Sequence, residues 1–221
     1  MYDFDKIARR YDCLNHLMTW GLDRGWRRKA VREMVDPTCK QLFLDVATGT
    51  GDVARELMQK AHPESLLTGI DLSEEMLAIA RRKVSVRATL ICADAEQMPF
   101  EENRFDCVSV AFGVRNFSHI EQGLAEMYRV LKPGGKLVVL ELTTPENPIL
   151  LKLYKLYACK IIPLLGGLVA RNREAYTYLP NSILQFPKPV RFLQMLSGAG
   201  FVNPTCRRFT FGVCGMFVAK K

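Results

Sequence analysis

Three acidic residues end or follow short apolar runs, and a pair of glycines lies beside the first. Asp45 belongs to the run 42–46, which leads into Gly49-Thr50-Gly51, and Asp71 and Asp94 close two later runs. Glycines lack a Cβ, so the backbone can turn sharply there and a ligand can approach closely. Asp71 follows Gly51 by about 20 residues, a spacing at which a carboxylate accepts hydrogen bonds from ribose hydroxyls. These residue types and spacings predict a nucleotide or nucleoside site.

The glycine loop argues against a dinucleotide. The third glycine of a pyrophosphate-binding loop is missing, because Ala54 follows Asp52-Val53. A nucleoside without phosphates therefore fits better than NAD. A Gly-x-Gly pair alone remains a weak signal, since an ordinary strand-to-helix turn uses it too.

Apolar runs alternate with helical patterns through the first two thirds of the chain. The run 42–46 is apolar on both faces, as a parallel strand buried under helices requires. We expect further strands at 68–72, 88–93, 105–112 and 136–141, a turn at 132–135, and helices at 1–34 with a break at 20–22, at 53–61, after Ser73, and at 120–131. This alternation predicts a parallel α/β sheet with right-handed crossovers. The last third adds a helix at 189–199 and strands at 201–209 and 213–219.

Composition is that of one large globular domain. The chain has 221 residues, 48% of them hydrophobic and 24% charged. Its seven cysteines form no Cys-x-x-Cys pair and follow no signal peptide, so we expect reduced, mostly buried thiols in a cytosolic protein, with Cys107 inside a strand. The three histidines are scattered without ligand spacing, and no metal site is expected.

The positive charge is concentrated in the last third. Residues 148–221 hold 11 Lys and Arg against one acid, a net charge of +10, whereas the first 147 residues sum to −2. A basic face toward lipid headgroups, nucleic acid or an acidic substrate is one interpretation, and a solvated face without a partner is another. The apolar stretch 148–170 carries Lys152, Lys155, Lys160 and a Pro/Gly break, which favours an interfacial or lid element over a membrane span.

Four motifs in order resemble those of the class I S-adenosylmethionine-dependent methyltransferases. They are Asp45-x-x-x-Gly49-x-Gly51, Asp71, Asp94-Ala95 and Leu131-Lys-Pro-Gly-Gly135. Ala47 departs from the pattern, because many members have glycine there.

Over nearly the whole chain the sequence is similar to the ubiquinone/menaquinone biosynthesis C-methyltransferases. The residues that carry this resemblance are Phe4-Asp-x-Ile-Ala8-x-x-Tyr11-Asp12-x-x-Asn15, Gly21-x-x-Arg24-x-Trp26-Arg27, Ala111-Phe-Gly-Val-Arg-Asn116, Arg129-Val-Leu-Lys-Pro-Gly-Gly135, Tyr176-x-Tyr178-Leu179 and Phe186-Pro187. The N-terminal and Phe-Gly-x-Arg-Asn signatures are the most specific of these.

The resemblance implies an α/β, Rossmann-like fold. Its central sheet is expected to have seven mostly parallel strands, an antiparallel last strand and helices on both faces. A single methyltransferase domain would then cover 1–221, with a helical lid at 1–36, a cofactor-binding core at 37–147, a lid or substrate insertion at 148–188, and a final helix and strands at 189–221.

S-adenosylmethionine is the cofactor that the resemblance implies. Its methionyl part would lie on the loop with Gly49, Thr50 and Gly51, its ribose on Asp71, and its adenine on Asp94-Ala95. Asp45 either orders the loop and favours the cationic sulfonium, or braces the loop without touching the ligand. Met76 and Tyr11 complete the expected cofactor set.

The implied reaction is C-methylation of a polyprenyl quinol ring, with demethylmenaquinol to menaquinol preferred over a benzoquinol. The donor sulfur becomes neutral when the methyl leaves, so the enzyme must supply alignment and an electron-rich carbon, not an acid. We expect Arg115 to stabilise the developing phenolate and Asn116 to orient the ring hydroxyl. Tyr178 is a candidate for proton handling, with Tyr11 and His119 as alternatives.

The polyprenyl tail of such a substrate lies in a bilayer. We therefore expect a cytoplasmic protein that is peripheral at the inner face of the cell membrane and contacts anionic lipid. No nucleic-acid partner is expected, and the oligomeric state is open, a homo-oligomer included. Two other readings remain: a basic class I methyltransferase acting on RNA or another small molecule, and a non-catalytic cofactor-binding scaffold in a quinone-biosynthesis assembly.

Overall fold

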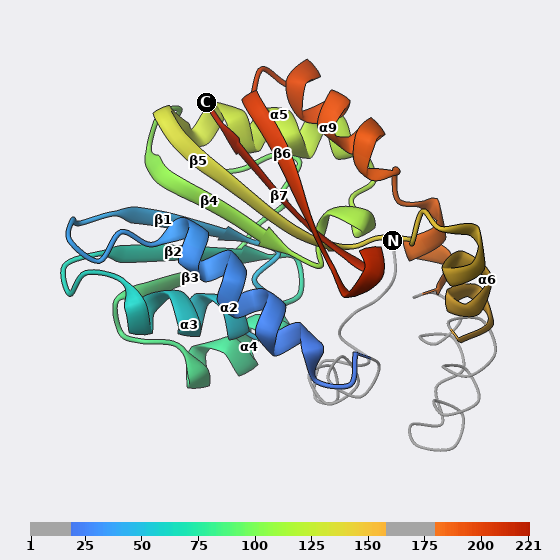
Figure 1. Ribbon diagram of the computed structural model, residues 1–221. Coiled ribbons are helices and arrows are strands. Elements are labelled where there is room, and N and C mark those ends of the chain that lie inside the picture. Colours follow the sequence, from blue (N-terminus) through green and yellow to red (C-terminus); the bar gives the residue numbers. More distant parts are fainter. Residues whose placement is uncertain (1–18, 158–179) are drawn as a thin grey trace.

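Seven strands form one sheet in the order β3-β2-β1-β4-β5-β7-β6 (Figure 1). The computed structural model describes residues 19–157 and 180–221. The strands are β1 (Leu42–Val46), β2 (Leu66–Asp71), β3 (Ala88–Cys92), β4 (Phe105–Ala111), β5 (Leu131–Leu142), β6 (Val202–Phe209) and β7 (Cys214–Lys220). β7 runs antiparallel to both of its neighbours, and the other pairs are parallel. The predicted mostly parallel seven-stranded sheet with an antiparallel last strand is confirmed.

Helices cover both faces of this sheet. They are α2 (Leu22–Met34), α3 (Asp52–Lys60), α4 (Glu74–Lys83), α5 (Ile120–Val130), α6 (Pro148–Leu156) and α9 (Pro189–Gly198), with short 3₁₀ turns η2 (Val114–Asn116) and η4 (Thr210–Gly212). α2 and α3 pack on one face and α5 and α9 on the other. In Figure 1, α6 lies off the end of the sheet.

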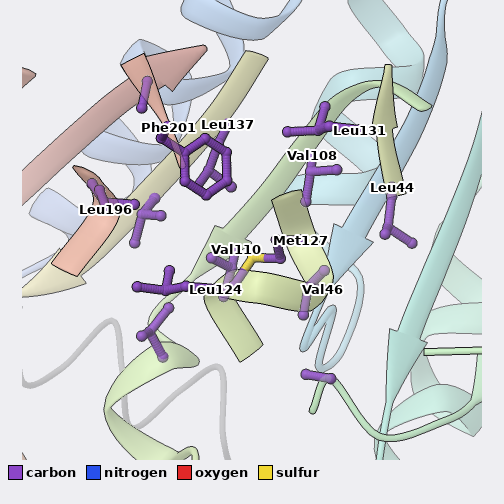
Figure 2. Packing of buried hydrophobic residues seen from close by; sticks show 14 of the residues in the cluster. Leu44, Val46, Val108, Val110, Leu124, Met127, Leu131, Leu137, Leu196 and Phe201 are labelled. Atoms are coloured by element: carbon purple, nitrogen blue, oxygen red, sulfur yellow. The ribbon is translucent and has the colours of Figure 1, made fainter. Parts of the chain in front are cut away.

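The core explains why β1 is apolar on both sides. Successive strand residues point to opposite faces, and Phe43 and Leu44 are both fully buried, one in each of two hydrophobic clusters. Figure 2 shows the cluster under α5, where Leu124 and Met127 meet aliphatic side chains of the central strands, Val110 among them. Burial under two helical layers thus explains the apolar side chains on both faces of β1.

One turn expected from the sequence is part of a strand. Lys132-Pro-Gly-Gly135 lies inside β5, because Leu131 already pairs with Phe105 before the register shifts at Cys107. Gly134 takes up this irregularity with a φ of +77°. Among the described residues, the other predicted strand and helix boundaries agree with the observed ones within one or two residues.

Several predicted features lie outside the described residues. They include Tyr11, Tyr178 and Lys160, together with most of the expected N-terminal lid. α2 begins after a left-handed Trp20-Gly21 pair, at the predicted break. Within 19–157 and 180–221, no helix has both the length and the apolarity to cross a membrane.

The expectation of mostly buried cysteines is wrong for the described ones. Cys107 and Cys214 are buried and Cys206 is half-buried, but Cys39 and Cys92 are exposed. Cys39 lies in the loop before β1 and Cys92 ends β3, which is an edge strand, so neither is covered by a helix layer. Cys107 is inert, since burial raises the pKa of its thiol to about 12.

Candidate active site

A cavity of about 240 Å³ opens at the carboxyl ends of β1, β2, β3 and β4. From β1 the sheet continues to β2 on one side and to β4 on the other, so the cavity lies where the strand order reverses. Open α/β sheets bind ligands at this point. The described residues that line the cavity are Arg27, Asp45, Ala47, Thr48, Gly49, Thr50, Asp52, Val53, Asp71, Leu72, Ser73, Met76, Ala93, Asp94, Ala95, Glu96, Ala111, Phe112, Gly113, Asn116 and Phe117.

Asp45 braces the loop after β1 and also lines the cavity. Its Oδ2 accepts a hydrogen bond from Thr48 Oγ1 at 2.7 Å, and its Oδ1 accepts one from Ser109 Oγ at 2.6 Å. Burial raises the pKa of Asp45 to about 6, although the two hydroxyl donors act to lower it. The position of Asp45 therefore allows either expected role, bracing the loop alone or also favouring the cationic sulfonium.

Left-handed backbone shapes the same loop. Gly49 and Gly51 have φ values of +56° and +82°, and Ala47 has +51°. A Cβ on Gly51 would lie 3.0 Å from the Cβ of Ala80, so this glycine also lets α4 pack closely. Ala47 is not a glycine, and an L-residue in this conformation costs about 1–2 kcal/mol.

Asp71 ties the glycine loop to the next crossover. Its Oδ2 accepts the Gly49 N–H at 2.8 Å and its Oδ1 accepts the Ser73 N–H at 2.9 Å. Each carboxylate oxygen has a second lone pair, so the group can still accept hydrogen bonds from a ligand. Ser73 caps α4 by accepting the Met76 N–H, and Met76 is buried against the cavity.

The segment after β3 is held by its neighbours. Asp94 Oδ1 accepts the Glu96 N–H at 2.8 Å, and Glu96 Oε1 accepts the backbone N–H groups of Ser118 and His119. Burial opposes ionisation of Glu96, but these donors and the His119 side chain outweigh it and lower its pKa. Glu96 therefore presents a fixed negative charge at the cavity wall.

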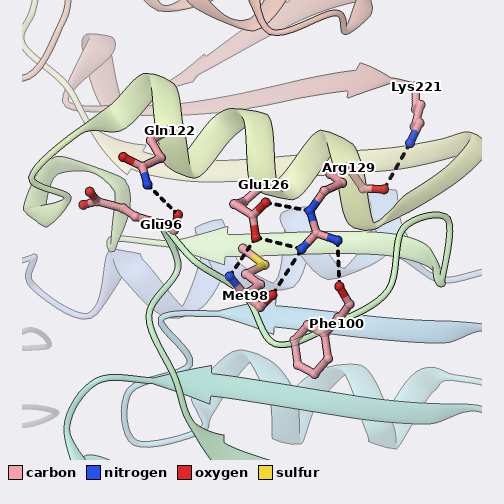
Figure 3. A network of polar contacts seen from close by, with 7 residues as sticks. All are labelled: Glu96, Met98, Phe100, Gln122, Glu126, Arg129 and Lys221. Carbon is pink, nitrogen blue, oxygen red and sulfur yellow. Dashed lines mark hydrogen bonds and ion pairs between the residues drawn. The ribbon is translucent and has the colours of Figure 1, made fainter.

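Arg129 fastens the rest of that segment to α5 (Figure 3). Its guanidinium donates to the carbonyls of Phe100 at 2.6 Å and Met98 at 3.1 Å. It also pairs with Glu126, whose Oε2 accepts the Met98 N–H at 2.7 Å. This network gives a structural reason for the arginine in the Arg129–Gly135 signature.

The two predicted catalytic residues on η2 point differently. Asn116 lines the cavity, whereas Arg115 is not among the lining residues. The Arg115 side chain is 3% exposed, its Nη1 lies 2.7 Å from Glu141 Oε1, and it also donates to the Phe112 carbonyl. Glu141 Oε2 accepts the Arg115 backbone N–H at 3.2 Å. A direct contact of Arg115 with a substrate stays a prediction.

Arg27 is a lining residue whose place the sequence analysis missed. It appeared there only inside the Arg24-x-Trp26-Arg27 signature. The signal was its position: Arg27, Ala30, Val31 and Met34 follow helical spacing along one buried face of α2. Asp52, Glu96, Phe112 and Phe117 are further lining residues that sequence reasoning did not single out.

The charges of the cavity suit a cationic nucleoside. The described lining residues include five carboxylates, Asp45, Asp52, Asp71, Asp94 and Glu96, and a single cation, Arg27. S-adenosylmethionine carries a sulfonium and an ammonium against one carboxylate, so its net charge is opposite to that of the wall. The residues present therefore fit this cofactor. Within the described part of the chain, no group of three or more His, Cys, Asp or Glu residues could hold a metal ion.

Comparison with known proteins agrees with this geometry. The sequence model of the ubiE/COQ5 methyltransferase family matches residues 2–221. The chain belongs to this family. Methyltransferase relatives include the demethylmenaquinone methyltransferases of Bacteroides fragilis, 44% identical over 99% of this chain and 90% of that protein, and of Deinococcus radiodurans, 45% identical over 99% and 90%. The ubiquinone/menaquinone biosynthesis C-methyltransferase of Geotalea daltonii is 41% identical over 99% and 94%.

Solved structures support the fold of this methyltransferase. A SAM-dependent methyltransferase from Thermotoga maritima has a TM-score of 0.69 at 16% identity and covers 99% of this chain and 98% of its own. One from Aquifex aeolicus has a TM-score of 0.63 at 18% identity, with 88% of each chain covered. The predicted family, fold class, methyltransferase activity and S-adenosylmethionine cofactor are confirmed.

Proposed function

We propose that this methyltransferase converts demethylmenaquinol to menaquinol with S-adenosylmethionine as the methyl donor. The observation that carries the proposal is the match, at 44–45% identity over 99% of this chain, to proteins named demethylmenaquinone methyltransferases. The cavity supports it, since its lining includes Asn116 together with the described residues expected to bind the cofactor, except Gly51.

The cofactor would lie along the carboxyl ends of β1 to β3. Gly49 and Thr50 would hold its methionyl part, Asp71 the ribose hydroxyls, and Asp94-Ala95 the adenine, with Met76 packing beside it. Gly51 does not line the cavity, and its left-handed backbone completes the turn of this loop. When bound, S-adenosylmethionine supplies a methyl group on a positively charged sulfur. Asp45 would favour that positive charge, because it is a buried carboxylate on the same wall.

The acceptor would enter beside η2. The described wall there consists of Phe112, Gly113, Asn116 and Phe117, so a flat aromatic ring would meet aromatic neighbours and one amide. Asn116 would orient a ring hydroxyl. The quinol is the reactive form, since a quinone ring is electron-poor and loss of a phenolic proton raises electron density on the adjacent carbon. Tyr178 stays a candidate for handling the phenolic proton, with Tyr11 and His119 as alternatives.

Arg115 would act through its neighbours. Its guanidinium and backbone N–H both bind Glu141, and its Nη1 also binds the Phe112 carbonyl, so the residue fixes the backbone between Phe112 and Asn116. The Arg115 side chain is 3% exposed and is not among the described residues that line the cavity, so a direct contact with the phenolate is not needed to explain its position. We therefore assign Arg115 as a positioning residue for Asn116.

The assignment can be tested by methyl transfer from labelled S-adenosylmethionine. A short-tailed demethylnaphthoquinol should be methylated, and the oxidised quinone should not. A benzoquinol lacking the methyl group measures ring specificity. RNA of mixed sequence tests the alternative that the protein is a methyltransferase acting on RNA. Methylation of RNA but not of the naphthoquinol would refute the proposal. Accumulation of a demethylated quinone in a deletion strain would identify the ring independently.

We also propose that the protein contacts an anionic membrane through a membrane rim, which we define as Trp20, Ile149, Lys152, Leu153, Lys155, Leu156 and Phe211. α6 has no buried residue, and Ile149, Leu153 and Leu156 are 72%, 58% and 55% exposed. Lys152 and Lys155 lie exposed on the same helix. An apolar helix face with adjacent lysines is typical of interfacial helices on anionic lipid.

Two exposed aromatic residues belong to the membrane rim, one bonded at the end of α6 and the other in the η4 turn. The indole N–H of Trp20, whose side chain is 79% exposed, donates to the Tyr157 hydroxyl at 3.1 Å, just beyond the end of α6. Phe211 is 82% exposed, and both it and Thr210 have left-handed backbone. Its turn is tied to the segment before α6, because Thr143 Oγ1 donates to the Gly212 carbonyl at 2.8 Å. Aromatic side chains at this position would anchor in the headgroup region.

A further inference from the structure

Arg27 is a charged residue on the buried face of α2. It is 7% exposed and lies among Trp26, Ala30 and Val31, which pack against the sheet. Burying a guanidinium is costly unless hydrogen bonds compensate it. Such a residue therefore needs partners, and the cavity that it lines is where a further partner can come from.

Among residues 19–157 and 180–221, the hydrogen-bond partners of Arg27 contact only one of its nitrogens. Nη1 donates to Asp23 Oδ2 at 2.6 Å and to Asp52 Oδ2 at 3.3 Å. A guanidinium has five N–H donors, and among the described residues every hydrogen bond of Arg27 comes from Nη1. The ring of Phe112 lies 5.4 Å from the guanidinium carbon. The two aspartates hold the side chain in place through Nη1, which leaves the Nε and Nη2 donors of a residue that lines the cavity for a ligand.

Arg27 also lies beside the loop expected to bind the methionyl part. Its partner Asp52 is the first residue of α3 and directly follows Gly51, which caps that helix. Lys83 binds the other oxygen of Asp52 at 3.1 Å, so this carboxylate is fixed from both sides. The guanidinium is thereby placed at the amino end of α3, where the helix dipole also favours an anion.

Charge matching identifies the ligand group. The α-carboxylate is the one anionic group of S-adenosylmethionine, and the other charged side chains among the described lining residues are carboxylates that would repel it. We propose that Arg27 binds the α-carboxylate of S-adenosylmethionine through its Nε and Nη2 edges, with Asp23 and Asp52 as positioning residues. This inference rests on the methyl donor of the proposed function and not on the acceptor.

The test measures binding by calorimetry without any acceptor. The two ligands are S-adenosylmethionine and its decarboxylated form, which lacks the α-carboxylate alone. Each is titrated into the wild-type protein and into Arg27→Met. A hydrogen-bonded charge contact is worth about 1.5–3 kcal/mol, or roughly a 10- to 100-fold change in affinity. The variant should lose about that factor for S-adenosylmethionine and less than about threefold for the decarboxylated ligand.

Lys83→Met is the matched control, because it removes the other cation from Asp52 without changing a described lining residue. It should leave the ratio of the two affinities within about threefold of wild type. Arg27→Lys keeps the charge but not the planar fork, so it should give an intermediate ratio. Thermal unfolding of each variant reports whether it folds.

Equal losses of both ligands in Arg27→Met would overturn the inference, because they would indicate a purely structural role. An unchanged affinity for S-adenosylmethionine would overturn it too. If Arg27→Met fails to fold, Arg27→Lys decides, and an unchanged affinity ratio there refutes the contact. Absence of S-adenosylmethionine binding by the wild type would refute the methyl donor as well. If the two affinities change as expected but no quinol is methylated, only the proposed quinol acceptor is refuted.

Discussion

Two walls of the cavity each carry a buried arginine, but they use it in opposite ways. The β1 wall, residues 45–53 with Arg27 of α2, turns its charged groups toward the cavity. The η2 wall, residues 111–117, turns the Arg115 guanidinium away from it and into an ion pair with Glu141. The described residues on the cavity side of the η2 wall are Ala111, Phe112, Gly113, Asn116 and Phe117.

The difference matches what each wall would bind. A cofactor with several charges needs ionised groups, whereas an aromatic ring needs apolar surface and one orienting dipole. Both arginines pair with a buried carboxylate, Arg115 with Glu141 and Arg27 with Asp23, but only Arg27 is among the described residues that line the cavity. A sequence motif thus shows that an arginine is present, but the tertiary structure decides whether its side chain lines the cavity, as Arg27 does, or not, as with Arg115.

The largest expected effect is the loss of stability when the ion pair behind the η2 wall is removed. Glu141→Ala leaves the Arg115 charge buried without its partner, so the free energy of unfolding should fall by about 3–5 kcal/mol. Urea denaturation measures this change. Glu146→Ala is the control, because Glu146 pairs with Arg208 at the surface and should cost less than about 1 kcal/mol. Similar losses in the two variants would show that the buried pair does not hold the wall.

The next effect breaks the β1 wall. Asp71→Ala removes the acceptor of the Gly49 and Ser73 N–H groups together with the expected ribose contacts. Since hydrogen bonds to a charged group contribute about 1.5–3 kcal/mol each, affinity for S-adenosylmethionine should fall by about 100-fold or more. Calorimetric titration measures it. Glu74→Ala, which removes an exposed carboxylate on α4, should bind normally. Unchanged affinity of Asp71→Ala for S-adenosylmethionine would show that this carboxylate does not bind the cofactor.

A smaller effect depends on pH. The pKa of Asp45 is raised from an ordinary 3.8 to about 6, chiefly by burial. A raised pKa means that this group stabilises the fold at low pH and that the contribution is lost as pH rises toward 6. Asp45→Asn should therefore be more stable than wild type above pH 6, by on the order of 1–3 kcal/mol, and the gap should close below pH 4. Chemical denaturation at several pH values checks this.

Affinity for the cofactor should rise with pH, whereas the stability contribution of Asp45 falls. Ionised Asp45 favours a cationic ligand, so the affinity of the wild type for S-adenosylmethionine should rise between pH 5 and pH 7. In Asp45→Asn this rise should be absent. The same pH dependence in both proteins would leave Asp45 as a brace only.

The smallest effect on stability is expected for substitutions on α6, which unlike the cavity walls has no buried residue. Lys152→Gln with Lys155→Gln should leave stability unchanged within about 0.5 kcal/mol, because both side chains are exposed. Binding to anionic vesicles should weaken about fivefold for each lysine and should fall with added salt. Lys60→Gln, in the last turn of α3, is the control. Salt-insensitive absence of vesicle binding by the wild type would refute the membrane rim.

Much of the fold could be predicted because the core is encoded locally. The run 42–46 is apolar on both faces, and the structure buries it from both sides. The antiparallel β7 came from the family resemblance, since a strand pattern alone does not give direction. The turn at Lys132–Gly135 was wrong because Leu131 pairs with β4 across a bulge that the Pro-Gly-Gly pattern conceals.

The sequence by itself determined that Asp45, Asp71 and Asp94 meet. Each belongs to or follows a parallel strand, and the carboxyl ends of parallel strands share one edge of the sheet. Only the tertiary structure decided which arginine faces the cavity. Arg27 reaches it because α2 packs its apolar face on the sheet, whereas Arg115 is drawn inward by Glu141, 26 residues along the chain on β5. Side-chain direction depends on such distant partners, and local spacing does not contain them.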